Sequence, residues 1–119
     1  MSEENKELVR RWYEAYNTGN VASLDEVMAP NFVDHSGTAD QTPGIEGMKQ
    51  RISNGRNNAG IESFTIEDLI DAGDKVVARY TMRGVDKAGL EGNPPTNKEY
   101  AVTGMAIYRI ANGKLVERW

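Results

Sequence analysis

The spacing of apolar residues changes near Ile61, and this change constrains the fold more than any other feature of the sequence. Before Ile61 the apolar positions recur every three or four residues, which is the period of an amphipathic helix. After it they alternate with polar positions, which is the period of a strand with one buried face. Helices followed by strands predict an α+β fold, with three N-terminal helices packed on a strongly curved antiparallel sheet.

Two helices are expected before Pro30. The first covers residues 4–17, where apolar side chains line one face and charged side chains the other, and Gly19 ends it. The second is shorter and runs from Val21 to Met28, because a proline cannot continue a helix.

The rest of the chain reads as one strand, one helix and then a meander of strands. Residues 32–34 are expected to form a short strand, and residues 45–52 a third helix that stops at Asn54-Gly55. Tight turns at residues 72–74 and at Asn112-Gly113 then separate alternating runs, with a longer polar loop between the second and third of them. The pattern predicts a four-stranded antiparallel meander.

A bent sheet closed at one end by helices encloses a conical space, so a pocket for a small organic ligand is expected. Its lining is predicted to come from one face of the helices, the short strand and the inward positions of the sheet. These residues are Trp12, Phe32, Met48, Ile52, Tyr80, Met82, Met105 and Ile107.

The composition excludes several classes of protein. With 119 residues and no internal repeat, the chain is expected to be one domain, 1–119. A net charge of −4 without a basic stripe argues against nucleic acid as a partner. The lack of cysteine and the single histidine argue against a metal site and favour a reducing, cytoplasmic setting. Neither a membrane-spanning run nor a signal segment is expected.

Asp34 and His35 are the one pair in the chain that could move a proton near neutral pH. In a functional interpretation, Asp34 lies in an apolar pocket with a raised pKa and acts as a base. In the alternative, it is a turn residue that bonds the backbone of Ser36 or Gly37. Strand alternation would place Asp34 on the inner face and His35 on the other, where His35 is a structural residue unless a bulge turns it inward.

The aromatic residues of the first helix have two possible roles. Trp12, Tyr13 and Tyr16 at helical spacing are most economically core residues. However, Trp12 and Tyr16 share one face and could reach the cavity mouth, where the Tyr16 hydroxyl would suit as a donor to an enolate.

Four segments of the chain resemble the SnoaL-like polyketide cyclase or ester cyclase family of the NTF2-like superfamily. They are WYEAYNTGN (12–20), LDEVMAPNFVDH (24–35), GDKVVAR (73–79) and YRIANGKLVE (108–117). The resemblance covers nearly the whole chain and agrees with the predicted order of elements. It implies a cone-shaped α+β domain and a homodimer formed through the outer face of the sheet.

The resemblance also implies cofactor-free acid/base chemistry on a small apolar carbonyl compound, without a metal. Asp34 would be the base, with His35 or Tyr16 as donor. Two departures from the family pattern keep an alternative open. Thr103, Met105 and Ile107 occupy the strand face that carries polar residues in characterised cyclases. The catalytic acid that those cyclases carry around the end of the last strand has no match near Trp119. Trp119 itself is predicted to be a pocket residue. The sequence therefore predicts either a cyclase or isomerase, or a non-catalytic small-molecule-binding or dimerisation module on the same fold.

Overall fold

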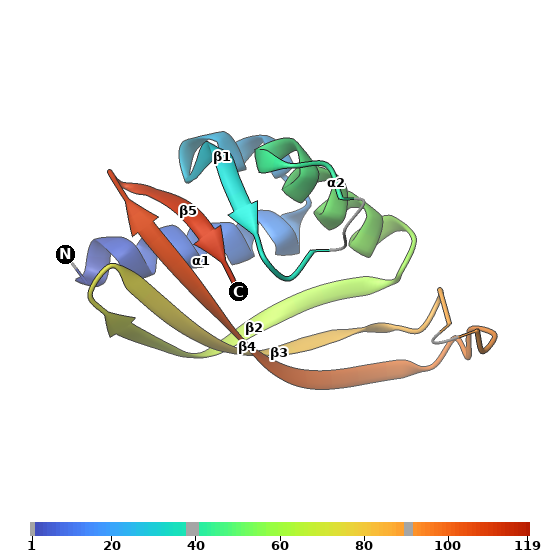
Figure 1. Ribbon diagram of the computed structural model, residues 1–119. Coiled ribbons are helices and arrows are strands. Elements are labelled where there is room, and N and C mark those ends of the chain that lie inside the picture. The colour runs from blue at the N-terminus through green and yellow to red at the C-terminus, as the bar shows by residue number, and fades with distance from the viewer. Residues whose placement is uncertain (1, 38–40, 90–91) are drawn as a thin grey trace.

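The computed structural model describes residues 2–37, 41–89 and 92–119, which form one curved five-stranded sheet with helices on one face (Figure 1). The α+β architecture predicted from the sequence is confirmed. In chain order the elements are α1 (Ser2–Thr18), the 3₁₀ helix η1 (Val21–Glu26), β1 (Met28–Asp34), α2 (Gly44–Asn57), β2 (Ile61–Ala72), β3 (Lys75–Val85), β4 (Glu99–Ala111) and β5 (Lys114–Arg118).

Two helix boundaries differ from the prediction. The second helix is a 3₁₀ helix that ends at Glu26, and Met28 already belongs to β1. The third helix does not stop at Asn54-Gly55 but continues to Asn57. Gly55 is buried there beside the hydroxyl of Tyr16 on α1, so this glycine is required for close packing between helices rather than for a helix end.

The strand order is β1-β5-β4-β3-β2, and the predicted meander of β2 to β5 is antiparallel throughout. Its last turn has positive φ at Asn112 (52°) and Gly113 (73°), as a two-residue type I′ hairpin requires. β1 lies at the sheet edge and pairs with β5 in parallel. Pro30 is tolerated in β1 because an edge strand has unpaired positions.

The sheet has an inner face that packs on the helices and an outer face that does not. Val76, Ala78, Ala106 and Tyr108 are buried on the inner face. Thr103, Met105 and Ile107 alternate with these residues, so they lie on the outer face. The prediction that these three side chains point into the pocket is therefore wrong.

The strand pairing gives the reason, because Ala78 pairs with Ala106 and each residue shares its face with its direct partner. Met105 is 70% exposed on the outer face. A register shift between Ile66 and Asp68 also moves Asp68 to the outer face, where it pairs with Arg79.

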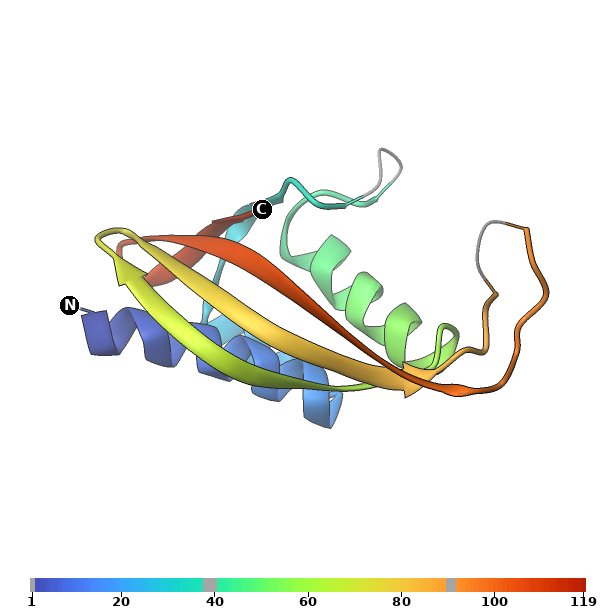
Figure 2. The same ribbon diagram turned by 90° about the horizontal axis from the view of Figure 1, so that it is seen from below.

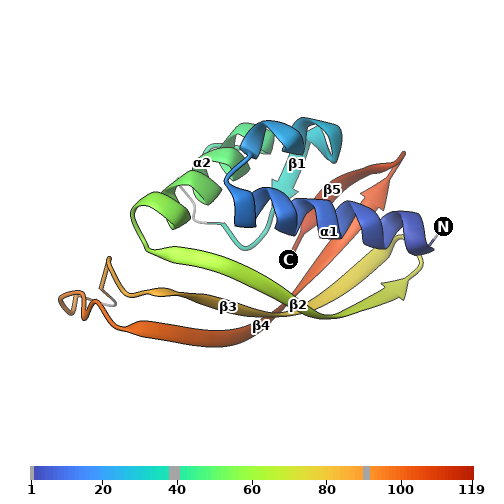
Figure 3. The ribbon, with the colours of Figure 1, turned by 180° about the vertical axis from the view of Figure 1, so that it is seen from behind.

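An aromatic cluster forms the centre of the core, where α1 crosses the inner face (Figure 3). Tyr13 packs edge-on against Trp12 at 4.8 Å and against Tyr108 on β4 at 6.0 Å. Tyr16 packs on Phe64 of β2 at 4.7 Å. Seen from below, the long strands β2, β3 and β4 cross under α1 and extend past it (Figure 2). α1 therefore covers only part of the inner face.

Gly55→Ala tests the contact between α1 and α2. Alanine gains about 1 kcal/mol over glycine inside a helix, but overpacking costs about 1–3 kcal/mol. A β-carbon at position 55 would overlap the Tyr16 hydroxyl, whereas its next neighbour, Ile61 Cδ1, lies at 3.3 Å. We expect Gly55→Ala to lower the free energy of unfolding by about 1 kcal/mol in urea titrations.

The control for this prediction is the same change in a Tyr16→Phe background. Removal of the hydroxyl leaves room for the methyl group, so Gly55→Ala should there raise the free energy of unfolding by up to about 1 kcal/mol. An equal effect in both backgrounds would show that the two helices do not pack in this way.

Candidate functional site

Asp34 ends β1 and turns its carboxylate toward the inner side of the fold, where its side chain is 4% exposed. Oδ1 accepts hydrogen bonds from the Ser36 backbone amide (3.0 Å) and from the Ser36 hydroxyl (2.6 Å). Oδ2 accepts one from Arg51 on α2, and Gln41 Nε2 lies 3.4 Å away. Asp34 is thus both the inward-facing residue and the turn residue that the sequence suggested.

Arg118 on β5 lies beside Asp34 because the parallel pairing of β1 and β5 places the two residues opposite each other. Its guanidinium is buried, with Nη1 3.8 Å from Asp34 Oδ1 and 2.5 Å from the Ser36 hydroxyl oxygen. Nε donates to the Tyr108 hydroxyl at 3.0 Å, and the group lies over the Trp12 ring at 5.3 Å. A buried charge is stable only with such partners, so Arg118 is held in place on all sides.

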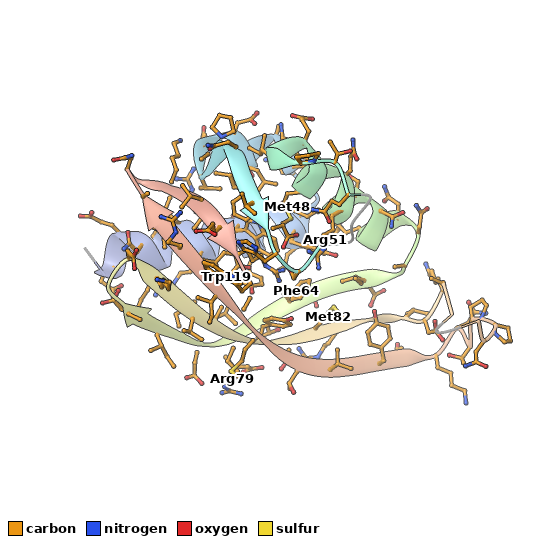
Figure 4. The ribbon with its side chains drawn as sticks, viewed as in Figure 1. Met48, Arg51, Phe64, Arg79, Met82 and Trp119 are labelled. Carbon is orange, nitrogen blue, oxygen red and sulfur yellow. The ribbon has the colours of Figure 1, made fainter. Side chains whose placement is uncertain are left out.

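Arg51 is the second cation of the site and the more accessible one. Its side chain is 39% exposed, and Nη1 donates to Asp34 and, at 3.2 Å, to the Ser36 hydroxyl. Figure 4 shows Arg51 projecting from α2 on the helix side of the sheet, opposite the side that carries Arg79. Among the described residues, two guanidinium groups therefore face the Asp34 carboxylate.

The pKa of Asp34 is lowered, not raised as the sequence suggested. Burial alone would raise it, but the hydrogen bonds from Ser36 and the positive charges of Arg51 and Arg118 together lower it. The carboxylate is ionised at neutral pH. In contrast, burial raises the pKa of Tyr16, so its phenol stays protonated.

Two pockets adjoin this cluster and share Gln41 and Thr42 as lining residues. One, of about 420 Å³, is bordered by Asp34 and the rest of the β1 end. The other, of about 490 Å³, is bordered by Arg51 and other residues of α2. Both volumes lie in the range of small-molecule sites.

A third pocket, of about 500 Å³, lies at the open end of the inner face. Its apolar walls are Ile61, Met82, Tyr100 and Val102, and the loop after β3 closes its side. Val102 is 47% exposed there although it is on the inner face. Asp86 organises this loop, because its carboxylate accepts hydrogen bonds from the Gly89 and Thr96 amides. These bonds lower the pKa of Asp86.

His35 lies on the outer face, away from these pockets, as alternation along β1 predicts. Its Nε2 is 2.7 Å from Glu117 Oε2, and its ring stacks on Trp119 with centroids 4.9 Å apart. Glu117 also accepts a hydrogen bond from Arg109 at 2.5 Å. The His35 and Arg109 bonds lower the pKa of Glu117. The structure therefore separates His35 from Asp34, and His35 pairs with Glu117 on the outer face instead.

The remaining predicted site residues fall into three groups. Trp12, Tyr16, Phe32, Met48 and Ile52 are buried in the core, at most 5% exposed. Tyr80 and Met82 are half-buried on the inner face, and Tyr80 lies against Gly104. Thr103, Met105, Ile107 and Trp119 lie on the outer face, so their assignment to the pocket was wrong.

Sequence reasoning missed Arg51 and Arg118, and it named Ser36 only as a backbone donor to Asp34 and not for its hydroxyl. The useful signal for Arg118 was its position in an alternating strand, on the same face as the apolar Tyr108 across the hairpin. Arg51 gave no comparable signal, because an arginine among the polar residues of an amphipathic helix is expected on its solvent side. Within the described residues, no group of three side chains could hold a metal ion, and no helix is long and apolar enough to cross a membrane.

The curved sheet, the helices on its inner face and the site at the end of β1 define an α+β domain of the NTF2-like type. Residues 6–119 match the family described as SnoaL-like polyketide cyclase, and the chain belongs to that family. A search of curated proteins found no match.

Solved structures of the same fold are similar over nearly the whole chain. TsrD from Streptomyces laurentii is 28% identical with a TM-score of 0.87, and the match covers 100% of this chain and 87% of TsrD. A candidate polyketide cyclase from Bacillus cereus is 28% identical with a TM-score of 0.81, covering 98% and 72%. IdmH from Streptomyces antibioticus, also a candidate polyketide cyclase, is 29% identical with a TM-score of 0.77, covering 97% and 88%.

Asp34→Asn is expected to destabilise the fold, because it leaves the Arg118 guanidinium buried without a counter-charge. Loss of one partner of a buried pair costs about 3 kcal/mol or more. Since the pKa of Asp34 is lowered in the folded state, its contribution is full above the unfolded value of about 3.9 and is lost as the pH falls through the folded value.

Urea titrations of both proteins between pH 7 and pH 3 measure this contribution. The difference in unfolding free energy should be largest at neutral pH and should shrink below about pH 4. The matched control is Asp74→Asn, since Asp74 pairs with Lys75 at 3.4 Å in the exposed turn between β2 and β3. It should cost less than about 1 kcal/mol.

Proposed function

We propose that this protein is a cofactor-independent cyclase or isomerase that acts by acid/base chemistry on a small carbonyl compound. Membership of the SnoaL-like polyketide cyclase family supports the reaction class. The single observation that carries the assignment of the centre is the Asp34–Arg51 pair beside two pockets. It combines a base and a donor, which removal of a proton next to a carbonyl requires.

In the proposed step, an Asp34 oxygen takes a proton from the carbon next to the substrate carbonyl. The C–H electron pair moves into the C–C bond, and the carbonyl π electrons move to oxygen as an enolate. The negative charge thus passes from Asp34 to the substrate oxygen. Arg51 pairs with Asp34 before this step and is accessible enough to follow the charge to the enolate. For a cyclase, the enolate carbon then attacks a second carbonyl of the same molecule.

The lowered pKa of Asp34 is compatible with this role. A carboxylate that is ionised at neutral pH is ready as a base, and strong donors to the enolate compensate for its weak basicity. Arg51 is a permanently charged donor. Tyr16 stays protonated but is 5% exposed, so it is the weaker candidate as donor. We assign the apolar walls at Met82 and Val102 to the apolar part of the substrate.

A second candidate function is a non-catalytic small-molecule-binding module. The observation in its favour is that both oxygens of Asp34 already accept hydrogen bonds and that the carboxylate is nearly buried. A carboxylate with this set of partners is typical of a structural residue. The two functions differ in whether Asp34 exchanges a proton with a bound ligand.

Exchange of carbon-bound protons for deuterium, followed by NMR on small ketones such as 4-oxopentanoate, distinguishes the two functions. If Asp34 is the base, the protein should speed exchange next to the carbonyl, and Asp34→Asn should lower the rate at least about 100-fold. The rate should be constant at neutral pH and fall in acid, as the pH drops through the lowered pKa of Asp34.

The control is again Asp74→Asn, which changes an ion-paired aspartate in the turn between β2 and β3 and should leave the rate unchanged. The measurements are made at a temperature at which circular dichroism shows Asp34→Asn to be folded. Ligand binding without any exchange above the buffer rate would favour the binding module.

We further propose that the protein is a homodimer through the outer face. Met105, Ile107 and Trp119 expose apolar surface there, at 70%, 37% and 41%. Met105→Lys should then convert the dimer to a monomer in analytical ultracentrifugation, because it would bury a second positive charge in the interface beside Arg79, which lies opposite Met105 on β3. A sedimentation coefficient equal to that of the wild type would contradict this arrangement.

A further inference from the structure

We infer that the pocket beside Arg51 binds the carboxylate of its ligand, so that the substrate is a keto acid rather than a neutral ketone or ester. This inference rests on the proposed function, since it concerns the same site, and it adds the chemical class of the substrate. It departs from the expectation of a largely apolar ligand, which came from the sequence.

The charge balance of the site is the first observation. Arg51 and Arg118 both face Asp34, so these three side chains leave one positive charge uncompensated. The whole chain has a net charge of −4, so this local excess opposes the overall balance. A cation in a partly enclosed site attracts an anion more strongly than the same cation in water, because solvent screens it less.

The difference in exposure between Arg51 and Arg118 is the second observation. Arg118 is 8% exposed and surrounded by Ser36, Tyr108 and Trp12, so it is not available to a ligand. Arg51 is 39% exposed and lines the pocket of about 490 Å³. Both of its hydrogen bonds to described residues use Nη1. Its Nη2 and Nε can therefore present a planar pair of donors to a carboxylate.

The described residues around Arg51 complete a site for an anion. They are neutral, and most carry a hydroxyl or an amide: Ser36, Gly37, Gln41, Thr42, Gly47, Gln50 and Asn54. No carboxylate is among the residues described as lining this pocket. Such side chains donate hydrogen bonds to an anion without repelling it.

Asp34 does not prevent this binding. Its carboxylate is 4% exposed and is covered by Ser36 and Arg51, so a ligand meets the guanidinium first. Arg118 compensates part of its charge from the opposite side. A ligand carboxylate on Nη2 and Nε of Arg51 would place the carbon chain near Asp34, where the proton is removed, and would leave Nη1 beside Asp34 as the donor to the enolate.

Isothermal titration calorimetry with 4-acetylbenzoate and its methyl ester tests the inference, because the two probes share the ketone and the ring and differ in charge. In low salt, the acid should bind at least about tenfold more tightly than the ester. Raising the salt concentration should weaken binding of the acid and leave that of the ester nearly unchanged.

Arg51→Gln should lower affinity for the acid about tenfold or more and change affinity for the ester less than about twofold, whereas Arg51→Lys should retain part of the preference. The matched control is Arg10→Gln, which removes an ion-paired arginine from the exposed face of α1 and should leave the preference intact. Circular dichroism checks that each variant is folded. If Arg51→Gln is not folded, the acid-to-ester ratio and its salt dependence in the wild type decide the question.

Equal or tighter binding of the ester, or no binding of the acid, would overturn the inference. An unchanged preference in folded Arg51→Gln would do so as well. These outcomes are separate from the proposed catalysis, because affinity is measured without turnover. Preferential binding of the acid without proton exchange would support the carboxylate site and count against the enzyme.

Discussion

The burial of the Arg118 guanidinium is the constraint on which the rest of this structure depends. The charge is stable inside the core because the Trp12 and Tyr108 rings, the Tyr108 hydroxyl and the Asp34 carboxylate surround it. Asp34 reaches it from β1, which pairs in parallel with β5 and places the two residues opposite each other. Core and candidate site are thus one continuous set of contacts, and a change at either affects both.

Much of the fold follows from local patterns in the sequence. The helical period of α1 and the paired turn residues Asn112-Gly113 depend on neighbouring residues alone, and the structure agrees with both. Local patterns could not predict which side chains of β4 point toward the core, because both alternating sets of residues contain apolar side chains. One set includes Ala106 and Tyr108, and the other includes Met105 and Ile107. Pairing with β3 decides between them, and this is a tertiary effect.

The candidate site was predictable only in part. Asp34 was noticed because it stands next to the single histidine of the sequence. Strand alternation correctly placed Asp34 and His35 on opposite faces of the sheet. The partners of Asp34 could not be predicted, because they are distant in the sequence. Arg51 is 17 residues away, and Arg118 belongs to another strand. The pKa of Asp34 depends on these remote charges, which explains why the sequence suggested a shift in the wrong direction.

The contact between β1 and β5 also bears on when the site forms during folding. Ser36 and Arg118 are 82 residues apart in the chain, whereas the hairpins of the meander join neighbouring segments. Closing a long loop is costly in entropy, so distant pairings tend to follow local ones. A partly folded intermediate with its hairpins in place would still lack the arginine behind Asp34. The site is therefore assembled late, together with the completion of the native sheet.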